Sequence, residues 1–185
     1  MKKKLIPLLV VILMFASSPL RASNAEGLGL FLDFGQTKVI NNDTGREYYS
    51  SKIGGARYDY QFTLGKSFSF LLFGKEFSSK SELPENIKYE YYKTGIFGAE
   101  FRAWMGPVFF AIHGGRFFLT WLESLSLGSY SDIKWSSGSG WGLGIESTSG
   151  WSLSWYNEKS EKIIFDNLPD QRVDGKALIL GYRWD

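Results

Sequence analysis

The 185-residue sequence has no cysteine, five prolines and a single histidine, His113. The absence of cysteine excludes a disulfide framework and a cysteine-linked lipid anchor. One histidine among scattered carboxylates does not provide the ligand spacing of a metal site, so we predict neither a metal nor another cofactor. The chain has no sharp catalytic motif either, and its function has to be inferred from its architecture.

Long hydrophobic runs are also scarce. The apolar segment at residues 5–15 is about half of the roughly 20 residues that a membrane-spanning helix needs. It follows Lys2, Lys3 and Lys4, and it precedes Ala25, where small residues stand at both positions that a signal peptidase reads. We predict that residues 1–25 are a signal peptide, cleaved after Ala25 in Sec-type export, and that residues 26–185 form one domain.

The predicted mature chain lacks an excess of positive charge. The whole chain has 21 Lys and Arg against 19 Asp and Glu. Removal of residues 1–25 takes away four of the basic residues, which leaves 17 against 19 and a net charge of −2. The basic character therefore belongs to the predicted signal peptide, and no support remains for a nucleic-acid partner.

Alternation of apolar and polar residues runs through the mature chain. In residues 27–35, for example, the even positions are Leu, Leu, Leu and Phe, whereas the odd positions include Gly29 and Asp33. This period of two is typical of strands with two different faces. We predict eight strands, at 27–35, 56–62, 67–77, 89–102, 108–120, 133–147, 151–158 and 173–184. Long polar loops at 36–51, 78–88, 121–132 and 160–172 alternate with short turns.

An even number of strands, with both chain ends on the short-turn side, is typical of bacterial transmembrane barrels. Strands of about ten residues also match a tilted membrane crossing. The predicted fold is all-β: an eight-stranded antiparallel up-and-down transmembrane β-barrel with short periplasmic turns and four longer extracellular loops. A lipocalin-like soluble barrel also has eight strands, but its apolar side chains point inward.

The charged residues of the alternating strands decide between these two barrels. They share the face opposite the apolar residues, where they could pair in a small lumen but would fit poorly in an apolar pocket. We predict a lumen charge network of Asp33, Arg57, Asp59, Glu100, Arg102, Glu146 and Arg183. Aromatic residues gather at strand ends and predict two interfacial girdles: Trp104, Trp151, Tyr182 and Trp184 near the short turns, and Trp121, Trp135 and Trp155 near the long loops.

With its hairpin order, its inward charges and the terminal alternation of Leu180, Tyr182 and Trp184, the mature chain resembles the small outer-membrane β-barrel families. These include the OmpA transmembrane domain and OmpX. The resemblance implies an integral place in the cell outer membrane, contact with its lipid, and recognition of the C-terminal strand by the barrel-assembly machinery. One departure is Asp185, which makes the terminal aromatic residue penultimate.

The sequence is compatible with three alternative functions: a narrow channel, a lipid-modifying enzyme and a structural or surface-interaction protein. Eight strands enclose only enough space for side chains, which argues against an open pore, although a narrow small-solute channel through the charges is an alternative. A lipid A deacylase of the PagL-like family would need a histidine and a serine two residues apart, but Gly115 stands two residues after His113. His113 and Arg116 stand at an odd and an even position of the same predicted strand, so their side chains point to opposite faces. His113 faces lipid only if Arg116 faces inward.

The predicted long loops carry charged residues beside exposed apolar ones such as Ile163, Ile164 and Phe165. These three residues could instead extend the strand at 151–158 beyond the membrane. Loops of this composition on a rigid barrel suit contact with a host or matrix protein. The sequence therefore favours an outer-membrane barrel that is not an enzyme and has a structural or surface-interaction, adhesin-like role.

Overall fold

The structure is a computed structural model that describes residues 26–49, 54–80, 91–122, 133–166 and 169–184. The predicted signal peptide, residues 1–25, lies outside the described residues. The strands are β1 (Gly27–Asn41), β2 (Glu47–Tyr49), β3 (Gly54–Thr63), β4 (Phe68–Lys80), β5 (Tyr91–Met105), β6 (Val108–Leu122), β7 (Lys134–Glu146), β8 (Trp151–Ser160) and β9 (Gln171–Trp184). No helix in the described ranges is long and apolar enough to cross a membrane.

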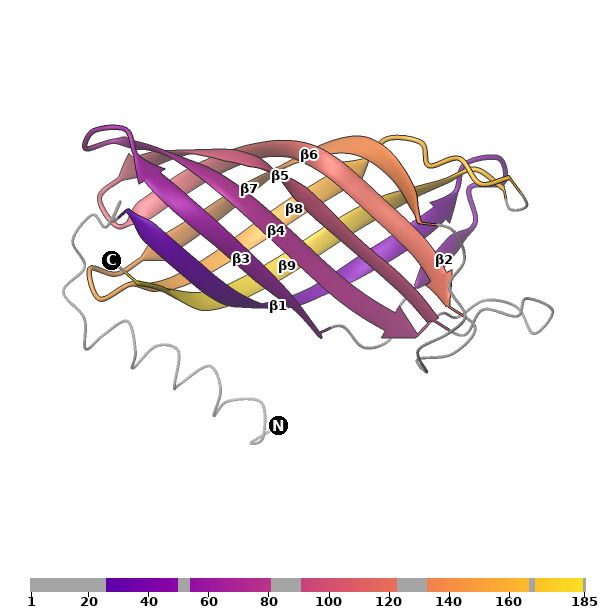
Figure 1. Ribbon diagram of the computed structural model, residues 1–185, viewed down its shortest axis with the longest axis horizontal. Coiled ribbons are helices and arrows are strands. Elements are labelled where there is room, and N and C mark those ends of the chain that lie inside the picture. The colour runs from indigo at the N-terminus through magenta and orange to yellow at the C-terminus, as the bar shows by residue number, and fades with distance from the viewer. Residues whose placement is uncertain (1–25, 50–53, 81–90, 123–132, 167–168, 185) are drawn as a thin grey trace.

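Every strand pairs antiparallel with its neighbours, and pairing of β1 with β9 closes the sheet into a barrel (Figure 1). Strands β2 and β3 both pair with β1, through 38–40 and 27–33, so they are two pieces of one barrel strand. The nine segments thus form the predicted eight-stranded antiparallel barrel with sequential strand order.

Short connections lie at one end of the barrel, together with the N-terminus of β1 and the C-terminus of β9 (Figure 1). We call this the short-turn end, and the opposite end the long-loop end. Gly65, Gly106 and Gly150 stand in the three short turns with φ values of 79°, 63° and 86°. Residues with a Cβ atom rarely adopt such positive φ values, whereas glycine adopts them readily. Glycine therefore occupies these three turn positions.

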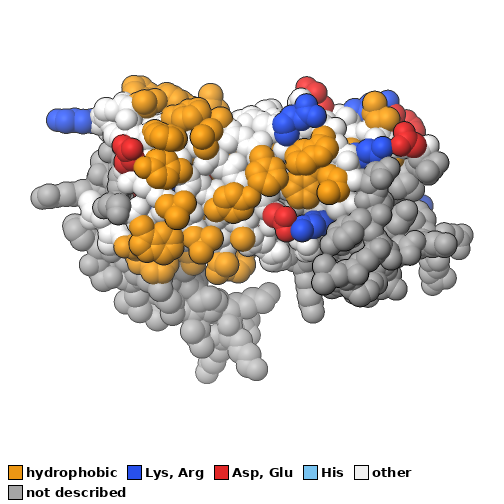
Figure 2. All heavy atoms as spheres, viewed as in Figure 1, with side chains coloured by type: hydrophobic (Ala, Val, Ile, Leu, Met, Phe, Trp, Pro, Cys, Tyr) orange, Lys and Arg blue, Asp and Glu red, His pale blue; other side chains and the backbone are white. Residues whose placement is uncertain are grey.

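The two faces of the wall differ in polarity. Outward positions carry large apolar side chains that are about half exposed, such as Leu30, Leu32 and Leu72, whereas inward positions carry buried charges such as Arg57 and Glu100. Hydrophobic side chains cover much of the face shown in Figure 2, and most charged side chains gather towards the long-loop end. This is the inside-out polarity of a lipid-facing barrel and the reverse of a lipocalin-like one.

The sequence-based prediction of the first long loop, 36–51, is wrong. Strand β1 continues to Asn41, pairs with β9 as far as Gln171, and turns through 42–46 into β2. The reason is that a strand beyond the apolar belt faces water on its outer side, so it no longer needs an apolar residue at every second position. Its outward residues Gln36 and Lys38 are polar, so the sequence pattern there resembles that of a loop.

An apolar cluster fills the lumen at the long-loop end. It consists of Val39, Phe73, Tyr92, Ile96, Phe117, Leu119, Trp121, Ile163, Phe165 and Val173. The sequence treated Ile163 and Phe165 as exposed loop residues, and for these two residues that prediction is wrong. The segment after β8 folds over the barrel mouth, where Ile163 exchanges two backbone hydrogen bonds with Gln171 and turns its side chain into the cluster. Burying these side chains removes apolar surface from water.

Substitutions at two adjacent isoleucines test whether the segment after β8 packs into the mouth of the barrel. Ile163 is fully buried, whereas Ile164 is 63% exposed. We expect Ile163→Ala to lower the free energy of unfolding by about 2–5 kcal/mol, because it opens a cavity in the cluster. Ile164→Ala is the matched control and should change the stability by less than about 0.5 kcal/mol. Urea unfolding in detergent micelles measures both, and equal effects would contradict the burial of Ile163.

Candidate functional site

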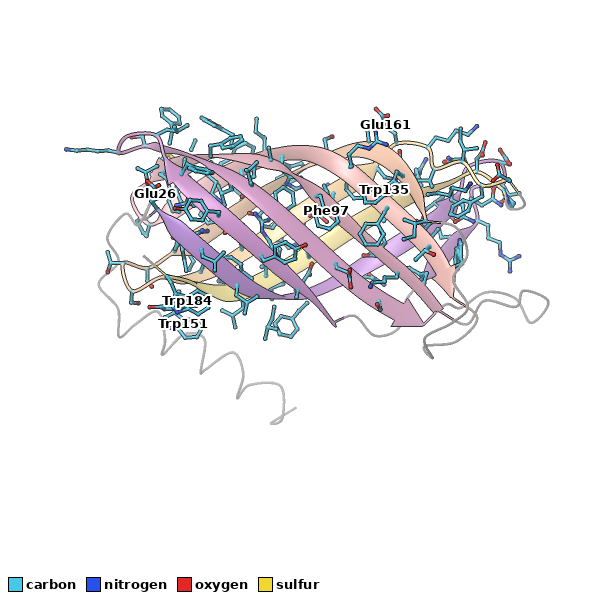
Figure 3. All side chains as sticks on the ribbon, in the orientation of Figure 1. Glu26, Phe97, Trp135, Trp151, Glu161 and Trp184 are labelled. Atoms are coloured by element: carbon cyan, nitrogen blue, oxygen red, sulfur yellow. The ribbon has the colours of Figure 1, made fainter. Side chains whose placement is uncertain are left out.

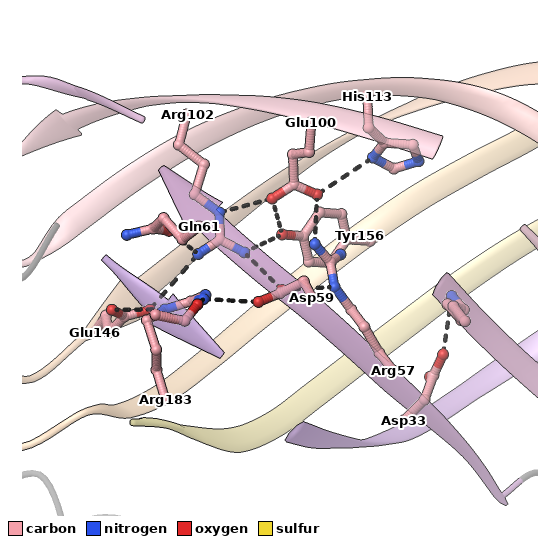
Figure 4. A network of polar contacts seen from close by, with 12 residues as sticks. Asp33, Arg57, Asp59, Gln61, Glu100, Arg102, His113, Glu146, Tyr156 and Arg183 are labelled. Atoms are coloured by element: carbon pink, nitrogen blue, oxygen red, sulfur yellow. Dashed lines mark hydrogen bonds and ion pairs between the residues drawn. The ribbon is translucent and has the colours of Figure 1, made fainter. Parts of the chain in front are cut away.

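All seven residues predicted for the lumen network lie inside the barrel and are buried. They come from β1, β3, β5, β7 and β9, and every one stands at an inward position of its strand (Figure 4). Four further buried side chains point inward: Lys75 on β4, His113 on β6, and Tyr156 and Glu158 on β8. Among the described residues, this network therefore comprises five carboxylates, three arginines, one lysine and one histidine.

Glu100 is the centre of this network (Figure 4). Its Oε2 accepts a hydrogen bond of 2.9 Å from Nη2 of Arg57, and its Oε1 accepts one of 2.6 Å from Nε of Arg102. The Tyr156 hydroxyl donates to the same Oε1 at 2.8 Å. Three strands are thus tied together at one carboxylate, and hydrogen bonds to charged groups are the strong ones.

A second group lies nearer the short-turn end. Nη1 of Arg183 donates to Oδ1 of Asp59 at 2.7 Å and to the backbone carbonyl of Gly27 at 3.1 Å. Glu146 lies 3.5 Å from Nε of Arg183 and 3.6 Å from Nη1 of Arg102. Arg183 is only 1% exposed although it is the third residue from the end of the chain. Its burial shows that side chains fill the lumen at this end too.

Asp33 pairs with a residue outside the predicted network. Nζ of Lys75 lies 2.8 Å from Oδ2 of Asp33 and 2.6 Å from Oε2 of Glu158. Lys75 is not among the seven residues of the predicted network. Its parity was the signal that could have found it, because Lys75 shares the side of Ser69 on β4.

His113 faces the lumen, and Arg116 faces outward. This settles the orientation that the sequence left open, because β6 pairs Glu100 opposite His113 and both must point to the same side. The ring nitrogens of His113 lie 3.8 Å from Glu100 and 3.6 Å from Glu158. A buried imidazole between two carboxylates cannot reach lipid, so the lipid-facing arrangement considered for a deacylase is not formed.

Aromatic rings pack around the charges. The guanidinium of Arg57 lies 4.4 Å above the Phe73 ring, and that of Arg102 lies 4.2 Å above the Phe109 ring. Glycines on β7 give these rings and the neighbouring ones room: a Cβ at position 142 would come within 2.5 Å of the Tyr156 ring. Within the described ranges, no group of three or more His, Asp or Glu could hold a metal ion. The hydrogen bonds and ion pairs of this network join strands that lie on different sides of the barrel.

No protein-family model matches the sequence, and neither does any curated protein. Solved structures do match the fold. Ail, the attachment invasion locus protein of Yersinia pestis, aligns with a TM-score of 0.56 and 16% identity over 86% of this chain and 100% of Ail. The same values hold for Ail in complex with the heparin analogue sucrose octasulfate. Neisserial surface protein A aligns with a TM-score of 0.58 and 12% identity over 85% of this chain and 97% of that one. The chain has the fold of a small outer-membrane β-barrel.

In this outer-membrane barrel fold, five of the seven aromatics predicted for the girdles have partly or largely exposed side chains. These are Trp135, Trp151, Trp155, Tyr182 and Trp184. Trp151 and Trp184 lie near the short-turn end, and Trp135 lies further towards the long-loop end (Figure 3). They stand at outward positions of β7, β8 and β9.

The girdle prediction is wrong for Trp104 and Trp121, which are 5% and 1% exposed and lie inside the barrel. Nε1 of Trp104 donates to the Ser69 hydroxyl at 2.9 Å, and Nε1 of Trp121 donates to Oε1 of Gln171 at 3.1 Å. Both indoles have an internal hydrogen-bond partner, so neither needs the interface to satisfy its N–H group. The sequence position of Trp104 could have placed it inside the barrel, because residues 100 and 104 are both even positions of β5 and lie on the same face.

Proposed function

We propose that the protein is an integral outer-membrane barrel with a surface-interaction, adhesin-like function carried by its long-loop end. The belt of outward apolar side chains and the fold support the membrane location. In this proposal, residues 1–25 are the signal peptide of Sec-type export, and β9, with Tyr182 and Trp184, is the segment that the barrel-assembly machinery reads. The barrel contacts outer-membrane lipid over its whole circumference.

The observation that carries the proposal is the filled lumen. Trp121 and Ile163 are buried at the long-loop end, Arg183 is buried at the short-turn end, and paired charges lie between them. A rigid interior of this kind supplies no pathway for a solute and no accessible site for chemistry. The surface above the membrane is where a function can reside, as is common for loops on a rigid scaffold.

The described part of the long-loop end is held by ion pairs. Nζ of Lys38 lies 2.9 Å from Glu47 across the β1–β2 hairpin, and Nζ of Lys134 lies 2.7 Å from Asp166. Lys162 pairs with Asp170. The Lys134–Asp166 pair joins the covering segment to β7, and the two backbone hydrogen bonds between Ile163 and Gln171 join it to β9. A surface that is ordered before binding loses less entropy on binding.

The similar structures support the same direction. Ail is named for attachment and invasion and has been solved with a heparin analogue, and the neisserial protein is named as a surface protein. By analogy of fold, we propose that this chain contacts a host or matrix protein.

Loop-exchange variants in lipid nanodiscs test this function. We expect the full barrel to bind immobilised basement-membrane extract saturably. Replacing residues 81–90 and 123–132 by short Gly-Ser linkers should weaken binding by about tenfold or more, which corresponds to about 1.4 kcal/mol. Replacing Thr148 and Ser149 in a short turn is the control, because that turn lies at the opposite end. Binding that survives the loop exchange, or current steps through the wild-type barrel in planar bilayers, would overturn the proposal.

A further inference from the structure

The outer wall of the barrel contains a polar hollow where β1, β8 and β9 meet. Its volume is about 500 Å³, and its lining residues include Gln36, Lys38, Asn157, Lys159, Asp174 and Lys176. All six are outward positions of their strands, so the hollow opens away from the lumen. The hollow lies on the part of the wall beyond the apolar belt, where the outward residues of β1 are polar.

The hollow begins where the apolar belt ends. The last apolar row across this wall consists of Phe34, Leu178 and Trp155, which are partners in the strand register. In the next outward row, Lys176 lies between Gln36 and Asn157. One row further, Asp174 lies between Lys38 and Lys159. Along β1, β8 and β9, the last row of apolar side chains is therefore followed directly by rows that contain lysines.

The outward positions that line the hollow carry three lysines and one aspartate, and of the lysines Lys38 pairs with Glu47 at 2.9 Å. Among the described residues, Lys159 and Lys176 have no ion-pair partner, and Asp174 is the one carboxylate on the outward positions that line the hollow. Asp174 already lies 3.5 Å from Nε of Arg172. Two outward lysines elsewhere in the described ranges are paired like Lys38: Lys93 lies 2.7 Å from Glu76, and Lys134 lies 2.7 Å from Asp166.

We infer that this hollow binds the phosphate group of an anionic amphiphile in the outer leaflet, with Lys38, Lys159 and Lys176 around the phosphate. The hydrocarbon part of the amphiphile lies along Phe34, Leu178 and Trp155. An ammonium group at the edge of a membrane loses hydration, and a phosphate compensates that loss by charge and hydrogen bonding. The inference rests on the membrane location proposed above but not on the partner of the loops.

Native mass spectrometry of the detergent-purified full barrel tests the site. The probe is phosphatidic acid, and phosphatidylcholine with the same acyl chains is the reference. We expect the barrel to retain phosphatidic acid in preference to phosphatidylcholine. Replacing each of Lys38, Lys159 and Lys176 by glutamine should weaken retention by roughly fivefold. Arg116→Gln is the matched control, since it removes one outward cation from β6, outside the hollow.

A second variant tests the site in the opposite direction. Asp174→Asn removes the competing carboxylate and should strengthen retention of phosphatidic acid. Equal retention of both lipids by the wild-type barrel, or an Arg116→Gln effect as large as that of Lys176→Gln, would overturn the inference. Full displacement by an equal concentration of inorganic phosphate would overturn the lipid assignment. Lys159→Gln, Lys176→Gln and Asp174→Asn leave the Lys38–Glu47, Lys134–Asp166 and Lys162–Asp170 pairs of the long-loop end intact, so loss of the proposed surface function would leave the results for these three variants unaffected.

Discussion

Glu100→Gln is expected to lower the free energy of unfolding by about 3–5 kcal/mol, the range for breaking a buried ion pair by removing one partner. Glu100 accepts hydrogen bonds from Arg57, Arg102 and Tyr156. A neutral amide at this position leaves two buried guanidinium groups without their shared counter-charge. The lost contacts join β3, β5 and β8, so the effect extends across the barrel.

Asp166→Asn is the matched control for this change. Asp166 also accepts a hydrogen bond from a cation, at 2.7 Å from Nζ of Lys134, but its side chain is 74% exposed. Neutralising an exposed pair should cost about 0–1 kcal/mol. Urea unfolding in micelles, followed by the mobility shift between folded and boiled protein, measures both variants. Similar losses would mean that water reaches the lumen and that the network does not support the barrel.

Leu32→Arg is expected to destabilise the lipid-inserted barrel by about 2–4 kcal/mol, the cost of an arginine on the lipid face near the bilayer midplane. Leu32 lies in the middle of the outward apolar residues of β1, beside Leu180 of β9. An arginine there must either stay in hydrocarbon or distort the bilayer to reach water.

Ile164→Arg is the control that distinguishes a position facing lipid from a position facing water. Ile164 and Leu32 are exposed to similar degrees, 63% and 58%, but Ile164 lies in the segment that covers the long-loop end. In a soluble barrel, both substitutions would place an arginine in water and have little effect. A large loss for Leu32→Arg alone, measured by refolding into lipid vesicles, is expected. Small and equal losses would contradict the membrane location.

The sequence alone determined the number of strands, their order and the polarity of the wall. A strand in a barrel places successive side chains on opposite faces, so the apolar and charged parity of β1, β3 and β5 could be read directly. The same parity identified the seven lumen charges. The same alternation also places Trp104 on the inward face of β5, whereas its position at a strand end favours an interfacial girdle.

Only the tertiary structure decided the register of β6, the pairing of the charges and the covering of the long-loop end. Strand β6 is apolar on both faces, so its own residues cannot fix its register, whereas its pairing with β5 places His113 opposite the inward Glu100. Asp33 meets Lys75, and Ile163 reaches the mouth of the barrel, because closure of β1 on β9 brings distant strands together. Periodicity reports which face a residue occupies, and contacts across a closed sheet depend on the tilt and stagger of all the strands.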